Sequence, residues 1–225
     1  MTAAPIHFER LPWERTQRLL RAMGRVLLDS EKTNEIIVAE EIAAQAQLRY
    51  WVEDGVFERG EGPDLLRDRP EIAHLDLDAL RTLPGGSLGH EFARFLDDHG
   101  IGLEGLDEPT PYTDGETEAY LLRRIRQCHD LWHLLLGVGT QGHEEILVHC
   151  FSVAQTGFPY SLAVISMGSV KHMLLEGRWK ALTRDTRRAY RSGREAKPLL
   201  TAYWERRWEQ PLDDVRREFG VVPVA

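Results

Sequence analysis

The residues most able to do chemistry lie in one segment, HDLWHLLLGVGTQGHEE, residues 129–145. His129 and His133 are four residues apart, so a helix of about 3.6 residues per turn places both imidazoles on the same face. Asp130 follows the first histidine, and Glu145 comes eleven intervening residues after the second. Two imidazole nitrogens and one or two carboxylate oxygens suit zinc, iron or manganese, and open coordination positions would permit catalysis. The segment therefore predicts a divalent metal site shared by two consecutive helices.

Three side chains of this segment and its surroundings leave alternatives open. Asp130 can bind the metal directly, or it can accept a ring N–H of a ligating histidine and fix the orientation of that ring. Glu144 can take the place of Glu145, but the two side chains project about 100° apart on a helix, so only one of them points inward. His149, four residues after Glu145, is either a further ligand or a histidine of the core or the surface.

A histidine pair on a helix also has an ordinary explanation, because polar residues near a helix end are often only solvated. Here the neighbours are apolar, since Leu131 and Trp132 lie between the histidines and a run of leucines occupies residues 134–136. Partly buried histidines each need a polar partner, which favours a site. Zinc proteases use a similar pair, but the glutamate that they place between the histidines is missing, so a metal-dependent hydrolase is a minor alternative.

The residues of the site are predicted to lie on two helices joined by a glycine-rich turn. Thr113 or Asp114 can cap the first helix, which contains both histidines and ends at Gly137. The second helix begins near Thr140 and carries Glu145. The turn must fold the second helix back across the first if Glu145 is to face the histidines.

Amphipathic spacing and a scarcity of strand signals predict helices along the rest of the chain, in a single all-α domain of residues 1–225. Two helices are expected over residues 14–30 and 33–51. Residues 60–72 contain several Gly and Pro residues and are expected to form a loop with short turns. The tail beyond residue 182 is expected to form three short helical pieces.

The composition narrows the class of protein. The chain has 225 residues, of which 42% are hydrophobic, and its net charge is −8. That charge argues against a nucleic-acid partner and against adhesion to anionic lipid by charge alone. The two cysteines, Cys128 and Cys150, are too few for a disulfide framework and do not have the spacing of metal ligands. Because Cys128 and His129 project apart on a helix, a Cys–His nucleophilic dyad is not expected. The sequence shows no signal peptide, transit peptide or run of membrane-spanning length.

His129, Asp130, His133 and Glu145, at this spacing, resemble the signature of the coenzyme Q biosynthesis protein 4 family. Three flanking segments extend the resemblance: LRTLPGGSLGHEFARFL, FSVAQTGFPYSLAVISMG and QPLDDVRREFGVVP. The resemblance runs over most of the chain, from the first helix to Val222.

This resemblance implies an α-helical, often dimeric protein of ubiquinone biosynthesis. Members are described as enzymes that decarboxylate a polyprenylated hydroxybenzoate ring, coupled to hydroxylation of that ring carbon. They are also described as non-catalytic scaffolds that bind prenylated lipid and organise the other biosynthesis proteins. The four signature residues carry over as metal ligands and catalytic residues. Because the chain has no mitochondrial presequence, the resemblance points to a bacterial member in the cytoplasm, peripheral to the inner membrane.

A prenylated substrate would also need an apolar pocket beside the metal, and residues 149–170 contain no Asp, Glu, Lys or Arg. Gly157 and Pro159 make this segment too broken to span a membrane. One interpretation is a fully buried core helix. The other is that its small residues make room for a lipid tail. These small residues are Ala163, Ser166, Gly168 and Ser169.

Overall fold

The computed structural model describes residues 4–28, 33–104, 106–108, 110–176 and 179–224. Within these ranges the regular elements are helices, which confirms the predicted all-α class. The α-helices are α1 (Trp13–Leu28), α2 (Thr33–Glu53), α3 (Gly62–Asp68), α4 (Leu77–Arg81), α5 (Leu88–His99), α6 (Glu116–Leu136), α7 (Gly142–Thr156), α8 (Pro159–Glu176), α9 (Trp179–Glu195) and α10 (Leu212–Phe219). Single 3-10 turns are η1 (Val56–Glu58), η2 (Ile72–His74) and η3 (Trp204–Arg206).

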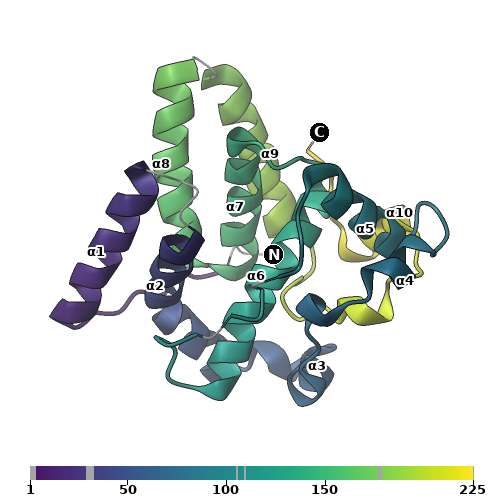
Figure 1. Ribbon diagram of the computed structural model, residues 1–225, viewed down its shortest axis with the longest axis horizontal. Helices are drawn as coiled ribbons and strands as arrows, with labels where there is room; N and C mark the ends of the chain where they lie inside the picture. The colour runs from purple at the N-terminus through teal and green to yellow at the C-terminus, as the bar shows by residue number, and fades with distance from the viewer. Residues whose placement is uncertain (1–3, 29–32, 105, 109, 177–178, 225) are drawn as a thin grey trace.

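Helices α6 and α7, which carry the predicted site, lie in the middle of the molecule. Figure 1 shows α7 with α8 and α9 beside it, and α7 packs against both. On one side α1 packs against α2, and α2 contacts α6 and α8. On the other side lie α4, α5 and α10, of which α5 contacts α6. Three fully buried tryptophans, Trp51, Trp132 and Trp204, come from α2, α6 and η3, so the core surrounds α6.

The end of α6 is set by a glycine, as predicted. Gly137 has φ +69°, a left-handed conformation that glycine adopts without steric cost. Its N–H donates to the Leu134 carbonyl at 3.1 Å, and Val138 N–H donates to the His133 carbonyl at 3.1 Å. The predicted cap at the other end is wrong, because Gly115 rather than Thr113 or Asp114 occupies the N-cap position.

The C-terminal part of the chain stabilises the last turn of α6. Arg216 donates to the carbonyls of Leu135 and Leu134 at 3.0 and 2.8 Å. Val224 N–H donates to the Leu136 carbonyl at 2.9 Å. The carbonyls of Leu135 and Leu136 are among those that a helix end leaves without an intrahelical partner, and the Leu134 carbonyl gains a second donor beside the Gly137 N–H.

A buried ion pair joins the middle of α6 to η3. Arg124 is fully buried and pairs with Glu205 through contacts of 2.5 and 2.9 Å. Removing one member of such a pair leaves an uncompensated charge in the core, which costs about 3–5 kcal/mol. The position of α6 therefore depends on residues that follow it by about eighty positions in the sequence.

Two elements differ from the sequence expectation. Residues 60–72 were expected to form a loop, yet they contain α3, whose first turn holds Pro63, a position where the missing N–H costs nothing. The first piece of the tail is longer than expected, since α9 extends over 17 residues. Because α9 packs along α7, tertiary contact sustains a longer helix than the local sequence indicates.

Among the residues of helix α8 whose side chains are described, the buried ones lie at its beginning. Pro159, Tyr160 and Ser161 are buried, residues 162–165 are half-buried and Ser166 is exposed. The side chain of Ser169 lies outside the described residues. This gradient excludes the interpretation of residues 149–170 as a fully buried core helix. In the described parts of the chain, no helix combines the length and the apolar character needed to cross a bilayer.

The close packing of α9 on α7 predicts that adding one methyl group at Gly193 destabilises the protein. A Cβ at Gly193 would lie 2.6 Å from the Phe151 carbonyl oxygen and 3.1 Å from Ala154 Cβ. We expect Gly193→Ala to lower the free energy of unfolding by about 1–3 kcal/mol, because backbone must move to admit it. Gly24→Ala in α1 is the matched control: nothing lies within 4 Å of its Cβ position, so we expect a gain of up to about 1 kcal/mol. Urea unfolding measures both, and a Gly193→Ala chain as stable as the unchanged protein would contradict this packing.

Candidate metal centre

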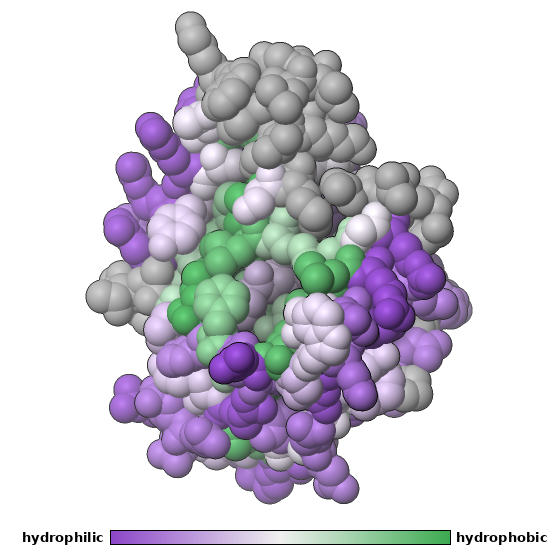
Figure 2. Space-filling view, turned by 90° about the vertical axis from the view of Figure 1, so that its left-hand side faces the viewer, coloured by the Kyte–Doolittle hydropathy of each residue, from purple (hydrophilic) through white to green (hydrophobic). Residues whose placement is uncertain are grey.

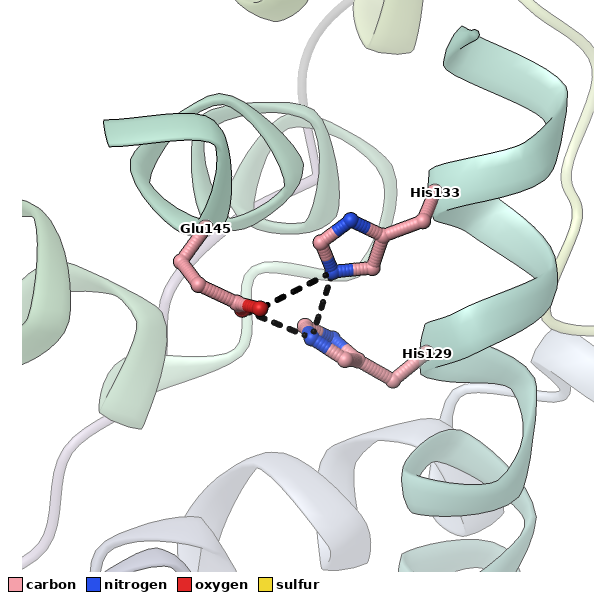
Figure 3. A group of neighbouring side chains, drawn as sticks. All are labelled: His129, His133 and Glu145. Carbon is pink, nitrogen blue, oxygen red and sulfur yellow. Dashed lines mark hydrogen bonds and ion pairs between the residues drawn. The ribbon is translucent and has the colours of Figure 1, made fainter. Parts of the chain in front are cut away.

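The structure brings three of the four predicted site residues together (Figure 3). His129 Nε2 lies 3.1 Å from Glu145 Oε2 and 3.1 Å from His133 Nε2. His133 Nε2 lies 3.4 Å from Glu145 Oε1. The histidines come from successive turns of α6, and Glu145 comes from the first turn of α7. The turn between the helices therefore places Glu145 opposite the two histidines, as the sequence required of it.

His133 is oriented by a backbone carbonyl. Its Nδ1 lies 2.8 Å from the Gly139 carbonyl oxygen, and its side chain is fully buried. Because a carbonyl oxygen only accepts hydrogen bonds, Nδ1 must carry the proton. A ring whose single proton is on Nδ1 has its Nε2 lone pair directed toward His129 and Glu145.

The donor set fits a divalent cation. Nitrogen and oxygen ligands at about 2.0–2.2 Å from a tetrahedral zinc ion lie about 3.3–3.6 Å from one another. The three separations of 3.1, 3.1 and 3.4 Å are close to that spacing. Two imidazoles and one carboxylate also suit iron or manganese, and they leave coordination positions for a further ligand. His129, His133 and Glu145 thus form a group that could hold one metal ion.

The charges of this group support one another. Burial alone would raise the pKa of Glu145, but its contacts with His129 and His133 hold that pKa far below its usual range. Burial alone would lower the pKa of His129, yet the hydrogen bond to Glu145 and nearby carboxylates raise it above 6.5.

Asp130 is not a member of the converging group. Burial raises the pKa of its carboxyl, and the charges of His129 and His133 oppose that rise. The Asp130 carboxylate lies outside the group formed by His129, His133 and Glu145. Its role as a ligand or as a partner outside the coordination shell stays a prediction.

The two rivals that the sequence left open have distinct places. Glu144 accepts hydrogen bonds from the N–H groups of Gly139 and Gln141, so its carboxylate faces the turn and Glu145 faces the histidines. The His149 ring lies 5.2 Å from the His129 ring, and its Nδ1 lies 3.1 Å from Ser161 Oγ. His149 is therefore a neighbour of the group rather than one of its three members.

Cys128 faces away from the site. It is buried, burial raises the pKa of its thiol to about 11, and the charges of Arg124 and Glu205 act on it from the opposite side of α6. A buried thiol with a raised pKa is a poor nucleophile.

Sequence reasoning missed several polar neighbours of the site. Arg126 precedes His129 by three residues and therefore shares its helix face. Its Nε donates to Glu40 of α2 at 2.9 Å, and the charge of Glu40 contributes to the raised pKa values of His129 and Tyr160. The position of Arg126 on the same helix face as His129 could be predicted from the sequence spacing. The approach of α2 and α8 to the site depends on tertiary packing and could not be predicted in that way.

Comparison with known proteins gives the same assignment over nearly the whole chain. Residues 5–225 match the family model of coenzyme Q (ubiquinone) biosynthesis protein Coq4. The chain is 32% identical over 221 residues to the mitochondrial ubiquinone biosynthesis protein COQ4 homolog of Mus musculus, which covers 97% of this chain and 82% of that protein. The Homo sapiens homolog is 33% identical over 224 residues, covering 97% and 83%. A crystal structure from Nostoc punctiforme, named for ubiquinone biosynthesis, is 28% identical and has a TM-score of 0.73, covering 92% of this chain and 98% of that chain.

The geometry predicts which substitutions remove metal binding. We expect His133→Ala and Glu145→Gln each to weaken zinc affinity by more than about 100-fold, because loss of partners outside the coordination shell already costs 10–100-fold. His74→Ala is the control, since that side chain is 67% exposed and lies in η2. Titration calorimetry measures all three. Unchanged zinc affinity in folded His133→Ala protein would show that the ion binds elsewhere.

The raised pKa of His129 predicts how metal affinity depends on pH. A histidine must lose its proton to bind a metal, and His129 keeps its proton to higher pH than the usual 6.5. Zinc affinity should therefore rise with pH through and above 6.5, with proton release on binding. Calorimetry in buffers of different ionisation enthalpy counts those protons. An affinity that is flat between about pH 6 and pH 8 would contradict the raised pKa of His129.

Proposed function

Because the chain belongs to the Coq4 family of coenzyme Q (ubiquinone) biosynthesis proteins, we propose that it decarboxylates a polyprenylated 4-hydroxybenzoate-type ring with a divalent metal ion. The single observation that carries the proposal is the convergence of His129, His133 and Glu145 across α6 and α7. A non-catalytic organiser would need a lipid pocket but not three metal-ligating atoms within hydrogen-bonding distance of one another. His133 is fully buried and the other two side chains are half-buried, and burying such polar groups has a free-energy cost that is common at functional sites.

Decarboxylation of the ring would be favoured by an electrophile bound to one of the oxygen atoms of the substrate. A divalent ion bound there would polarise a phenol or carboxylate oxygen and stabilise the charge that develops as carbon dioxide leaves. His129, His133 and Glu145 would hold it, and Glu145 would offset one of its two positive charges. Zinc, iron or manganese fits this donor set, and a redox-active metal would serve if hydroxylation accompanies decarboxylation.

Two side chains beside the metal-ligating group have fixed protonation states at neutral pH. Burial and the positive charge of His129 lower the pKa of His149 to about 3, so its ring is neutral. Burial raises the pKa of Tyr160 above its usual range, so its hydroxyl stays protonated. Their rings lie 5.9 Å apart. We assign His149 as a hydrogen-bond acceptor and Tyr160 as a hydrogen-bond donor to the polar groups of the aromatic head.

The prenyl tail requires an apolar surface that leads away from these polar groups. Figure 2 shows a hollow bordered by apolar side chains on the face of the molecule that carries α1, α2 and α8. Helix α8 begins at Pro159, next to Tyr160 and Ser161, and becomes half-exposed toward that face. The partly buried apolar side chains of the three helices include Leu19, Met23, Ile36, Val38, Val164 and Ile165. We propose that this surface receives the tail.

The same face supports contact with a membrane that contains the lipid substrate. Trp13 and Leu20 of α1 are 70% and 62% exposed, and Phe8 just before α1 is 70% exposed. Large apolar side chains beside exposed arginines, such as Arg21, are typical of helices that lie in the headgroup region. Peripheral attachment, contacts with other ubiquinone biosynthesis proteins and a homodimer belong to this proposal.

The proposal predicts that ring decarboxylation requires the metal-ligating group. With a short-chain prenylated 4-hydroxybenzoate, dioxygen and added metal, we expect Glu145→Gln and His133→Ala to lower turnover by at least about 100-fold, because each removes a ligand. Release of carbon dioxide from carboxyl-labelled substrate is the measurement, and His74→Ala is the control. Folded variants that bind the lipid and retain full turnover would overturn the enzyme assignment and favour the organiser.

A further inference from the structure

We propose that Glu144 is a positioning residue whose carboxylate fixes the Gly139 carbonyl and thereby selects the metal-binding tautomer of His133. The inference rests on the metal site of the proposed function, but it concerns how that site is built. Glu144 neither touches the converging atoms nor belongs to their group.

The contacts form a chain of three residues. Glu144 Oε1 accepts the Gly139 N–H at 2.9 Å, and its Oε2 accepts the Gln141 N–H at 3.0 Å. The Gly139 carbonyl in turn accepts the His133 Nδ1–H at 2.8 Å. Gly139 is therefore bound on both sides, at its N–H by a carboxylate and at its carbonyl by an imidazole.

Only one of the two Glu144 bonds is needed to cap the helix. The bond to Gln141 satisfies an N–H at the beginning of α7, where a negative charge is also favoured by the helix dipole. The bond to Gly139 reaches two residues before Gln141, into the turn, and its donor is not an N–H group of α7. The turn contact is thus the one that a purely structural cap does not require.

The local packing shows that the turn is built around this carboxylate. A Cβ at Gly139 would lie 2.8 Å from Glu144 Oε2, so the side chain fits closely over the bare Cα. A glycine without such contacts has more backbone conformations than any other residue. The carboxylate removes that freedom at the residue whose carbonyl orients His133.

The consequence for His133 follows from its burial. Its side chain is fully buried, so its Nδ1–H depends on a protein partner. If the Gly139 carbonyl turns away, the proton can move to Nε2, where it faces His129 and blocks the lone pair needed by a metal. Outer partners of metal-bound histidines act in this way, and their loss typically lowers metal affinity 10–100-fold.

The test compares Glu144→Ala and Glu144→Gln with Asp76→Ala in the full chain. Asp76 caps α4 by accepting the Ala79 N–H at 3.1 Å, so its loss removes a carboxylate cap far from Gly139 in sequence and contact. Long-range proton–nitrogen NMR of the metal-free protein reports the His133 tautomer, and calorimetry reports zinc affinity. The melting temperature of each variant is measured alongside.

We expect the unchanged protein and Asp76→Ala to show Nδ1–H alone at His133. Glu144→Ala should show a mixture of tautomers and about tenfold weaker zinc binding, with a melting temperature lowered as in Asp76→Ala. Glu144→Gln should be intermediate, because its amide oxygen still accepts one N–H, and it serves as the readout if the alanine variant does not fold. A tautomer that stays pure in the Glu144 variants, with unchanged zinc affinity, would overturn the inference.

The two proposals fail in different ways. If the unchanged protein binds no zinc while Glu144→Ala alters the His133 tautomer, the positioning role stands and the metal-dependent function falls. If zinc binds and turnover is observed while the Glu144 variants match the unchanged protein in both readouts, the function stands and the positioning role falls.

Discussion

The site depends on one constraint, the reversal of the chain between α6 and α7 within residues 137–141. Gly137 ends α6 in a left-handed conformation, and the turn that follows brings Glu145 within 3.4 Å of both imidazole Nε2 atoms. The same turn supplies the Gly139 carbonyl that orients His133. Five residues thus determine both which groups meet and which lone pairs they present. A longer or less ordered turn would leave two histidines on a helix without a third ligand.

Much of the remaining structure stabilises the two helices joined by this turn. Arg216 and Val224 pair the last carbonyls of α6, so the C-terminal segment fixes the helix end that precedes Gly137. Gly193 admits the close approach of α9 to α7, which carries the carboxylate ligand. Contacts distant in sequence therefore act on the converging group of His129, His133 and Glu145 through the positions of α6 and α7. Helices α2 and α8 add polar neighbours of that group.

The local features of the site could be predicted from the sequence, and the tertiary ones could not. Helical periodicity places His129 and His133 on one face, and glycine preferences predict where α6 ends. The choice of Glu145 over Glu144 was open, because it depends on the rotation of α7 about its own axis after the turn. The place of Asp130 depends likewise on how α6 packs, and the structure leaves it outside the group of three. The half-exposed course of α8 depends on neighbours that its composition does not encode.

The central claim is that His129, His133 and Glu145 bind one divalent ion, and X-ray absorption at the zinc edge tests it most directly. Protein loaded with one equivalent of zinc should show two imidazole nitrogens and at least one carboxylate oxygen at about 2.0–2.2 Å, with no sulfur. The His133→Ala protein should retain at most one imidazole. A sulfur shell at about 2.3 Å, or a shell of oxygen atoms alone, would contradict the account.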